Sequence, residues 1–202
     1  MTDRTADISD SSDVRSYSWD EVIGFAARLG EKVKQLEVAP TAIVAILRGG
    51  AFPGLLMSHA LGIRRLHALT VSSTADEAPR AERRAAPMTA GVGGLPDLSD
   101  EHVLLVDDVT NTGRTLTVAG DAIQAVCHPR SITTGCLVWD TVPPEGSSVQ
   151  TVCMADLWID TVHAWAHFPW ESALRAAKGQ DQDSAHVGAS RTTVTRPEQQ
   201  QL

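Results

Sequence analysis

Two adjacent carboxylates end an apolar run in the stretch HVLLVDDVTNTGRT, which extends from His102 to Thr115. Like charges repel at this distance, so folding alone gives no reason to place Asp107 beside Asp108. The residues that follow are small and polar, and they lead into a predicted helix. Backbone N–H groups at a helix N-terminus, with threonine hydroxyls beside them, form a binding site for phosphate.

The two carboxylates cannot serve that phosphate, because they would repel it. They suit the hydroxyls of a sugar, or a hard divalent cation with its waters, a few ångströms away. The stretch therefore indicates one ligand with both a phosphate and a diol, and a phosphorylated ribose meets that description. The alternative is an acidic turn with an N-capping threonine, which explains the DD pair alone equally well. A Walker P-loop is excluded, since Arg114 stands where that motif needs a lysine.

A second loop with the residues of an anion site is LRGGAFPG, from Leu47 to Gly54. Arg48 supplies a bidentate donor, and Gly49 and Gly50 allow unusual backbone angles and the close approach of an anion. Taken alone, RGG is equally typical of a tight turn between a strand and a helix. Whether RGG indicates an anion site depends on whether the fold places this loop beside the acidic stretch.

Strands and helices are expected to alternate along the chain and to position both loops. Ser18 and Glu21 form a predicted capping box at the first helix, and Gly62 is expected to end the second. The carboxyl ends of parallel strands, where α/β proteins bind ligands, would then carry both loops. The expected elements are helices over 18–36, 52–62 and 114–126, strands over 41–47, 65–73, 102–108, 131–139 and 151–158, and a long loop over 74–101.

Composition sets limits on the class of protein. The 202 residues carry a net charge of -8, which argues against a general nucleic-acid binder. No apolar run is long enough to span a membrane and the N-terminus is too polar for a signal peptide, so we expect a cytoplasmic protein. The three cysteines form no metal-ligand pattern. We expect disordered tails over 1–16 and 179–202 around one domain over 17–178.

The stretch VLLVDDVTNTGRT resembles the phosphoribosyl pyrophosphate (PRPP) signature of type I phosphoribosyltransferases. Three further segments, SWDEV, AILRGGAFPGLLMSHALGIRRL and AWAHFPWE, are similar to the xanthine-guanine and archaeal purine branch, so that the resemblance covers about Tyr17 to Glu171. It implies an α/β fold with a central parallel sheet flanked by helices, a small hood and a long flexible loop. It also implies an enzyme of purine salvage that transfers the 5-phosphoribosyl group from PRPP to a nitrogenous base and releases pyrophosphate.

The resemblance also implies roles for individual residues. The peptide before Arg48 is often cis in this family, and Asp108 would be the residue closest to a magnesium ion. Asn111, Trp165 and Ala166 would contact the base, and the catalytic residues would be Arg48, Asp107, Asp108 and Asn111. The implied PRPP-binding set is Arg48, Gly49, Arg80, Asp107, Asp108, Val109, Thr110, Asn111, Thr112, Gly113, Arg114 and Thr115.

Two positions differ from the purine enzymes of the family, and both concern the base. Asn111 stands where an acid usually contacts the purine ring, and an amide cannot exchange a proton as a carboxylate does. Asp140 stands about where 6-oxopurine enzymes place a lysine after the following strand. An ionised acid can accept a hydrogen bond from an exocyclic amine but cannot donate to a carbonyl oxygen. The identity of the base therefore stays open.

A non-catalytic regulator that senses PRPP or a nucleotide is the alternative to an enzyme, and Asn111 together with the missing lysine favours it. The absence of a basic DNA-binding segment argues against it. His163 and His167 suggest a metal site only weakly, since a third ligand is missing. A hydrolase of the nucleophile-elbow type is disfavoured because the sequence contains no G-x-S-x-G. The resemblance further implies a homo-oligomer, a dimer or a tetramer. From the charge and the apolar runs we expect neither nucleic acid nor a membrane as partner.

Overall fold

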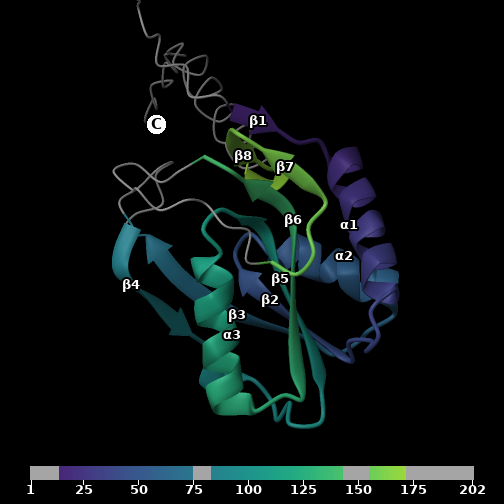
Figure 1. Ribbon diagram of the computed structural model, residues 1–202, viewed down its shortest axis with the longest axis vertical. Coiled ribbons are helices and arrows are strands. Elements are labelled where there is room, and N and C mark those ends of the chain that lie inside the picture. Colours follow the sequence, from purple (N-terminus) through teal and green to yellow (C-terminus); the bar gives the residue numbers. More distant parts are fainter. Residues whose placement is uncertain (1–13, 75–82, 143–154, 172–202) are drawn as a thin grey trace, which may run out of the picture. The chain divides into compact units, whose positions relative to one another are not determined.

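The computed structural model describes residues 14–74, 83–142 and 155–171 (Figure 1). The strand segments rich in Val, Ile and Leu form the buried centre of a sheet, and the segments with helical periodicity cover its faces. In chain order the elements are β1 (Val14–Ser16), α1 (Trp19–Lys34), β2 (Ala42–Leu47), α2 (Ala51–Leu61), β3 (Leu66–Thr74), β4 (Arg83–Ala90), the 3-10 helix η1 (Val92–Gly94), β5 (His102–Thr110), α3 (Arg114–Cys127), β6 (Ser131–Asp140), β7 (Asp160–Val162) and β8 (Trp165–His167).

The main sheet has six strands in the order β4-β3-β2-β5-β6-β7. Every pair is parallel except β3 with β4, so the predicted α/β sheet with parallel central strands is confirmed. β2 and β5 are neighbours at the centre, with Ala42 opposite Val103 and Ala45 opposite Val106. A separate two-stranded parallel sheet joins β1 to β8 and corresponds to the expected hood. The two loops singled out in the sequence therefore follow adjacent central strands.

α1 begins as the sequence predicts. Ser18 accepts a hydrogen bond from the backbone of Glu21, and the Glu21 side chain accepts one from the backbone of Ser18. This capping box satisfies two N–H groups that the first turn leaves without partners. Val22, Ala26 and Leu29 are buried at helical spacing and form the face that packs inward. α2 ends at Gly62, which has a left-handed backbone, as predicted.

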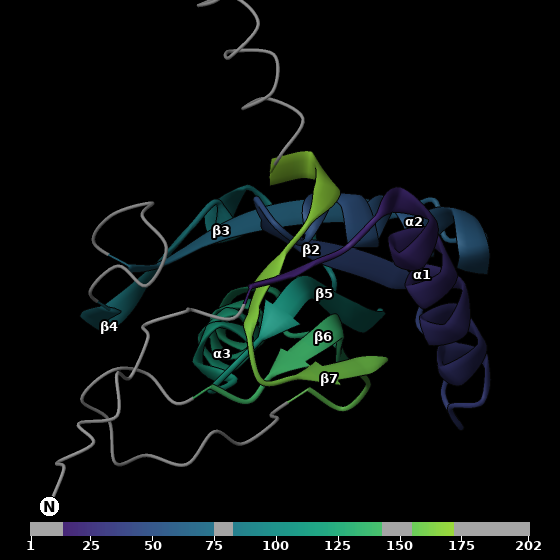
Figure 2. The ribbon, with the colours of Figure 1, turned by 90° about the horizontal axis from the view of Figure 1, so that it is seen from above.

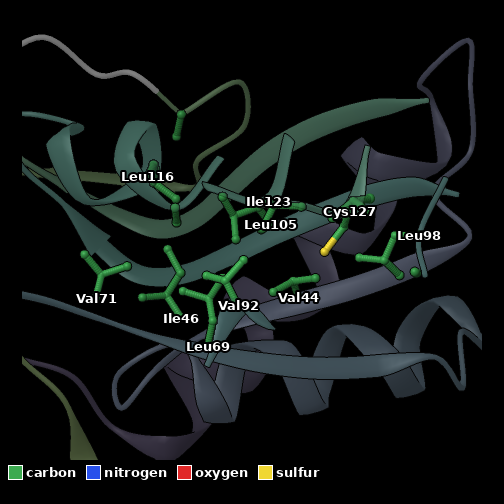
Figure 3. Close-up of a cluster of buried hydrophobic side chains, with 14 of the residues drawn as sticks. Val44, Ile46, Leu69, Val71, Val92, Leu98, Leu105, Leu116, Ile123 and Cys127 are labelled. Carbon is green, nitrogen blue, oxygen red and sulfur yellow. The ribbon is translucent and has the colours of Figure 1, made fainter. Parts of the chain in front are cut away.

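Helices cover both faces of the sheet (Figure 2). α3 lies over one face, where its Leu116 and Ile123 belong to the same buried cluster as Ile46 of β2 and Leu105 of β5 (Figure 3). α1 and α2 lie on the other face, where the backbone of Gly135 in β6 approaches Leu29 of α1. Because β2 and β5 are buried from both sides, the ends of these strands are held firmly in place.

Several segments differ from the sequence-based expectation. Residues 14–16 form β1 although the first 16 residues were expected to be disordered, and residues 83–90 form β4 inside the expected loop over 74–101. Of the strand expected over 151–158, residues 151–154 lie outside the described residues, and the described part forms only an isolated bridge at Leu157. The edge strand there is β7, which begins two residues after that segment ends. The tail expected over 179–202 lies outside the described residues.

The chain divides into a unit over Met1–His167 and a short second unit over Phe168–Leu202. In the described part of the second unit, the Glu171 side chain accepts a hydrogen bond from the backbone of Phe168, and the rings of Phe168 and Trp170 stack with their centroids 4.7 Å apart. Across the described residues, no helix has the length and hydropathy required to cross a bilayer.

Candidate active site

The two loops that carry the candidate site residues lie at the same edge of the main sheet. β2 leads into Arg48, Gly49 and Gly50 before α2, and β5 ends in Asp107 to Thr110 before the loop to α3. The strands run parallel side by side, so both loops emerge at their carboxyl ends. The Leu47–Arg48 peptide bond is cis, as the family resemblance implied.

Gly49 lies against the side chain of Asp108, so that the two loops are in contact here. A Cβ atom built on Gly49 would lie only 2.1 Å from Oδ2 of Asp108, and all three terminal atoms of that carboxyl group would lie within 2.5 Å of it. Any side chain at this position would displace the carboxylate. Gly49 was predicted to allow the close approach of an anion. In the structure, the absence of a side chain at Gly49 leaves room for the carboxylate of Asp108.

The two carboxylates differ in their surroundings. Asp107 is only 8% exposed, and its Oδ1 accepts a hydrogen bond from the backbone N–H of Asp108 at 3.0 Å. Asp108 is half-buried and accepts one from the N–H of Val109 at 2.7 Å. Burial, and then the neighbouring Asp108 carboxylate, raise the pKa of Asp107 well above the usual range of an aspartate. The described residues form no ion pair with Asp107 that would offset this effect.

The loop between β5 and α3, which was predicted to bind phosphate, enters the helix through a glycine. Gly113 precedes the helix with a φ of 73°, a left-handed conformation that favours glycine, and provides no side-chain cap. Arg114 and Thr115 are the first residues of α3. The N–H groups of the first helical turn therefore meet no capping side chain from Gly113 and suit an anion. Val109 to Thr112 connect this turn to the acidic pair.

Asn111 makes a contact that the sequence analysis did not anticipate. Its Nδ2 donates to the carbonyl oxygens of Asp140, at 2.8 Å, and Val142, at 2.6 Å. The Asp140 side chain folds back and accepts from the N–H of Val142 at 2.8 Å. Because both partners of the amide are carbonyl oxygens, the orientation of the Asn111 side chain is fixed by chemistry. Its partners lie 29 and 31 residues away, so no local signal in the sequence indicates the contact.

The predicted base-contacting residues Trp165 and Ala166 belong to β8, where they pair with Val14 and Arg15 of β1. They follow β7, whose Val162 accepts hydrogen bonds from the backbone and side chain of Thr141, the residue after β6. The structure therefore connects this segment to the end of β6. Gly49 and Asp108 come together directly, and Arg48 is next to Gly49 in the chain, whereas Trp165 and Ala166 are connected to the end of β6 through β7.

Two further predictions concern Arg80 and the histidines. Arg80 lies outside the described residues. His163 contacts Thr141, with Nδ1 of the ring 3.1 Å from the hydroxyl oxygen, and among the described residues no group of three or more His, Cys, Asp or Glu side chains is placed to hold a metal. The sequence analysis missed Tyr17, whose hydroxyl donates to Asp160 at 2.9 Å and connects the segment after β1 to β7.

Comparison with known proteins gives a consistent result. Residues 18–171 match the family model of the phosphoribosyl transferase domain. The chain is 28% identical over 161 residues to a xanthine-guanine phosphoribosyltransferase of Gluconobacter oxydans, which spans 78% of this chain and 84% of that protein.

Solved structures resemble the fold as a whole. A purine phosphoribosyltransferase from Pyrococcus horikoshii is 27% identical, with a TM-score of 0.58 over 78% of this chain and 94% of that chain. A xanthine-guanine-hypoxanthine phosphoribosyltransferase of Helicobacter pylori is 18% identical, with a TM-score of 0.63 over 82% of this chain and 99% of that chain. At this identity the second structure bears on the fold alone.

Proposed function

Since the chain belongs to the phosphoribosyl transferase family, we propose that it transfers the 5-phosphoribosyl group of PRPP to a purine base in nucleotide salvage. In this reaction the bond from C1 of the ribose to pyrophosphate breaks, and a bond from C1 to a ring nitrogen of the base forms. The observation that carries the proposal is the direct contact of the Asp108 carboxylate with Gly49, which joins the acidic pair to the loop of Arg48.

Each loop then has a role in holding PRPP. Asp107 and Asp108 would accept hydrogen bonds from the ribose hydroxyls, as carboxylates at this position suit a diol. The loop over 109–115 would hold the 5′-phosphate, supported by the helix N-terminus at Gly113. Arg48 and Gly49 would bind the pyrophosphate, with Arg48 as a charged donor that stabilises the leaving group.

The acidic pair fits a magnesium ion. Two carboxylates side by side, one of them buried without a cation among the described residues, supply the hard oxygen donors that Mg²⁺ prefers. Mg²⁺ usually binds through one or two carboxylates and substrate phosphates rather than in a protein cage. Asp108 would be the protein's direct contact with the ion, which when bound would neutralise charge on the pyrophosphate.

The chain's own residues would carry the rest of the mechanism. Positive charge develops on the ribose as pyrophosphate leaves, and the negative charge of Asp107 and Asp108 favours that state. The buried position of Asp107 strengthens this effect, because water screens it weakly. Trp165 and Ala166 would line the base pocket. Both N–H groups of Asn111 Nδ2 donate to backbone carbonyls, so this side chain has no N–H left to donate to a base.

The purine assignment rests on the two relatives at 28% and 27% identity, which are named as enzymes of xanthine-guanine and purine transfer. The alternative of a regulator that senses PRPP or a nucleotide gains no support from these comparisons. A homo-oligomer and a cytoplasmic location stay predictions, of which the first can be checked by light scattering on the purified chain.

Pyrophosphate release from PRPP and Mg²⁺ tests the proposal, with adenine, guanine, hypoxanthine, xanthine, uracil and orotate in separate reactions. We expect release with one or more of the purines. The Asp107→Asn/Asp108→Asn variant should lose it, while Asp121→Asn, on the exposed side of α3, should retain it. Release with uracil or orotate alone would overturn the purine assignment. Binding of PRPP without release for any base would favour the regulator.

A further inference from the structure

We propose that Asn111 is a positioning residue, which fastens the phosphate loop to the turn after β6 and exchanges no proton during the reaction. The inference rests on the proposed transfer reaction and concerns how its site is held together. Asn111 lies between Thr110, the last residue of β5, and Gly113, the residue before α3. It therefore sits where the loop leaves the sheet.

The contact itself has an unusual form. A single amide group donates to two backbone carbonyls, those of Asp140 and Val142, which are two residues apart on the same turn. We call this pair of hydrogen bonds the Asn111 tie. The turn is closed independently by the Asp140 side chain, which accepts from the N–H of Val142. The Asn111 tie therefore joins the phosphate loop to a turn whose conformation is stabilised by its own hydrogen bond.

Only an amide of this length can make the tie. Two carbonyl oxygens at 2.8 and 2.6 Å require two N–H donors from one atom, and a carboxylate has none. A protonated carboxyl group could supply one donor and an ionised one would repel both carbonyls. At the position where related purine enzymes carry an acid, this chain has therefore exchanged a group that titrates for one that holds two strand ends together.

The tie connects the two parts of the site that bind different halves of the reactants. β5 and β6 are adjacent and parallel, with Thr110 opposite Trp139, so their ends lie side by side. The loop after β5 would hold the ribose phosphate. The turn after β6 is hydrogen-bonded through Thr141 to Val162, three residues before the predicted base contact Trp165. The distance between C1 of the ribose and the base depends on this connection, and small errors in it are costly.

The charged and titratable groups described around the tie are those of Asp107 and Asp108 at the end of β5, Arg114 at the start of α3, Asp140 on β6, and His163, which hydrogen-bonds the residue after β6. All of them are retained when residue 111 alone is changed. A difference in pH dependence between the wild type and a variant at that position therefore reports on the introduced group.

The test compares Asn111→Asp with Gln124→Glu, an identical amide-to-acid change on the exposed side of α3. We measure kcat/KM for pyrophosphate release from pH 5 to pH 9. For Asn111→Asp we expect a loss of about 10- to 100-fold at pH 8, because two hydrogen bonds are replaced by repulsion. The deficit should shrink as the pH falls and the introduced carboxyl becomes protonated. Gln124→Glu should follow the wild type throughout.

The opposite slope would overturn the proposal. If residue 111 served as a proton acceptor, Asn111→Asp would gain activity relative to the wild type as the pH rises and its carboxylate forms. Equal activity of the variant and the wild type at every pH would overturn the proposal as well, since it would show that the reaction does not depend on the Asn111 tie.

A second measurement is independent of catalysis and separates this inference from the proposed function. The carbon-13 signal of the carboxyl introduced by Asn111→Asp is followed by NMR as the pH is changed, in the protein without substrates. Two facing carbonyl oxygens disfavour the ionised form, so the midpoint should lie above the ordinary value of about 4. A midpoint at or below that value would overturn the tie, even in a protein whose transfer activity is established. Absence of transfer in the wild type would contradict the proposed function alone.

Discussion

Two buried carboxylates near opposite ends of β5 have the same exposure and opposite surroundings. Glu101 precedes the strand and Asp107 lies near its end, and each is 8% exposed. Glu101 forms an ion pair with Arg65 and accepts a hydrogen bond from Thr41. Asp107 has another carboxylate as its neighbour, and no described cation pairs with it. Burial alone therefore does not distinguish a structural acid from a functional one.

The difference lies in whether the fold compensates the charge. A buried charge is costly unless it is paired and hydrogen-bonded. At the amino end of β5 the protein supplies the partner, so that Glu101 holds β2, β3 and β5 together. At the carboxyl end the cost of burying Asp107 is left uncompensated by the described residues, which is a feature typical of functional sites.

The largest effect is expected when the uncompensated pair loses a charge. Asp108→Asn should lower kcat/KM for pyrophosphate release about 10³-fold, because the ribose and the metal lose the anion that favours the transition state. Asp121→Asn, on the exposed side of α3, is the matched control and should stay within twofold of the wild type. Nearly full activity of Asp108→Asn would contradict the functional role that we assign to the acidic pair in contrast to Glu101.

Gly49→Ala should lower activity about 10²-fold, since its Cβ would meet Oδ2 of Asp108 at 2.1 Å and displace the carboxylate from the pyrophosphate loop. Gly93→Ala has no heavy atom within 4 Å of the added carbon and serves as the control. Activity is measured under the same conditions for both. Equal activities would show that Asp108 can move without consequence.

Glu101→Gln tests the compensated end. The change should lower the free energy of unfolding by about 2 kcal/mol, measured by urea denaturation, because it breaks a pair in which Glu101 is buried and Arg65 is half exposed. Asp100→Asn removes an exposed pair with Arg130 and should change it by less than about 0.5 kcal/mol. A marked loss of kcat in folded Glu101→Gln would contradict the purely structural role.

The smallest effect is expected in the pH dependence of stability. The folded protein raises the pKa of Asp107 above its value in the unfolded chain, so the folded state binds that proton more tightly. Its contribution to stability is therefore lost as the pH rises from the unfolded pKa, about 4, through the folded one, and stays lost above it. Asp107→Asn should be more stable than the wild type at neutral pH in the absence of PRPP, and the advantage should vanish below pH 4 in denaturant titrations. A constant difference across the range would contradict this origin.

The sequence predicted the central strands and the helices well, because their signals are local. The capping box at Ser18, the left-handed stop at Gly62 and the apolar runs of β2 and β5 each depend on a few neighbouring residues. The acidic pair and its loop were equally visible. β1 and β4 were not, since β1 has only three residues and β4 contains a proline and two arginines, and both strands lie at a sheet edge where they acquire their structure from a partner strand.

Contacts between segments were the part that the sequence left open. Asn111 was recognised as a departure from an acid, but its two carbonyl partners come from another strand end, 29 and 31 residues away. Asp140 was considered as a contact for the base, and its carboxylate caps its own turn. Register between neighbouring strands decides such contacts, and a single sequence gives little information on register.

The pairing of β1 with β8 has a consequence for how the protein is made. Val14 lies opposite Trp165, so the first described strand can pair only after the last described strand, β8, has been synthesised. β5, the strand that carries the acidic pair, is by contrast complete at Thr110. As the chain leaves the ribosome from its N-terminus, β2 and β5 become available for pairing early, whereas β8 becomes available only when synthesis has passed His167. A nascent chain released before that point would lack the strand that carries Trp165 and Ala166.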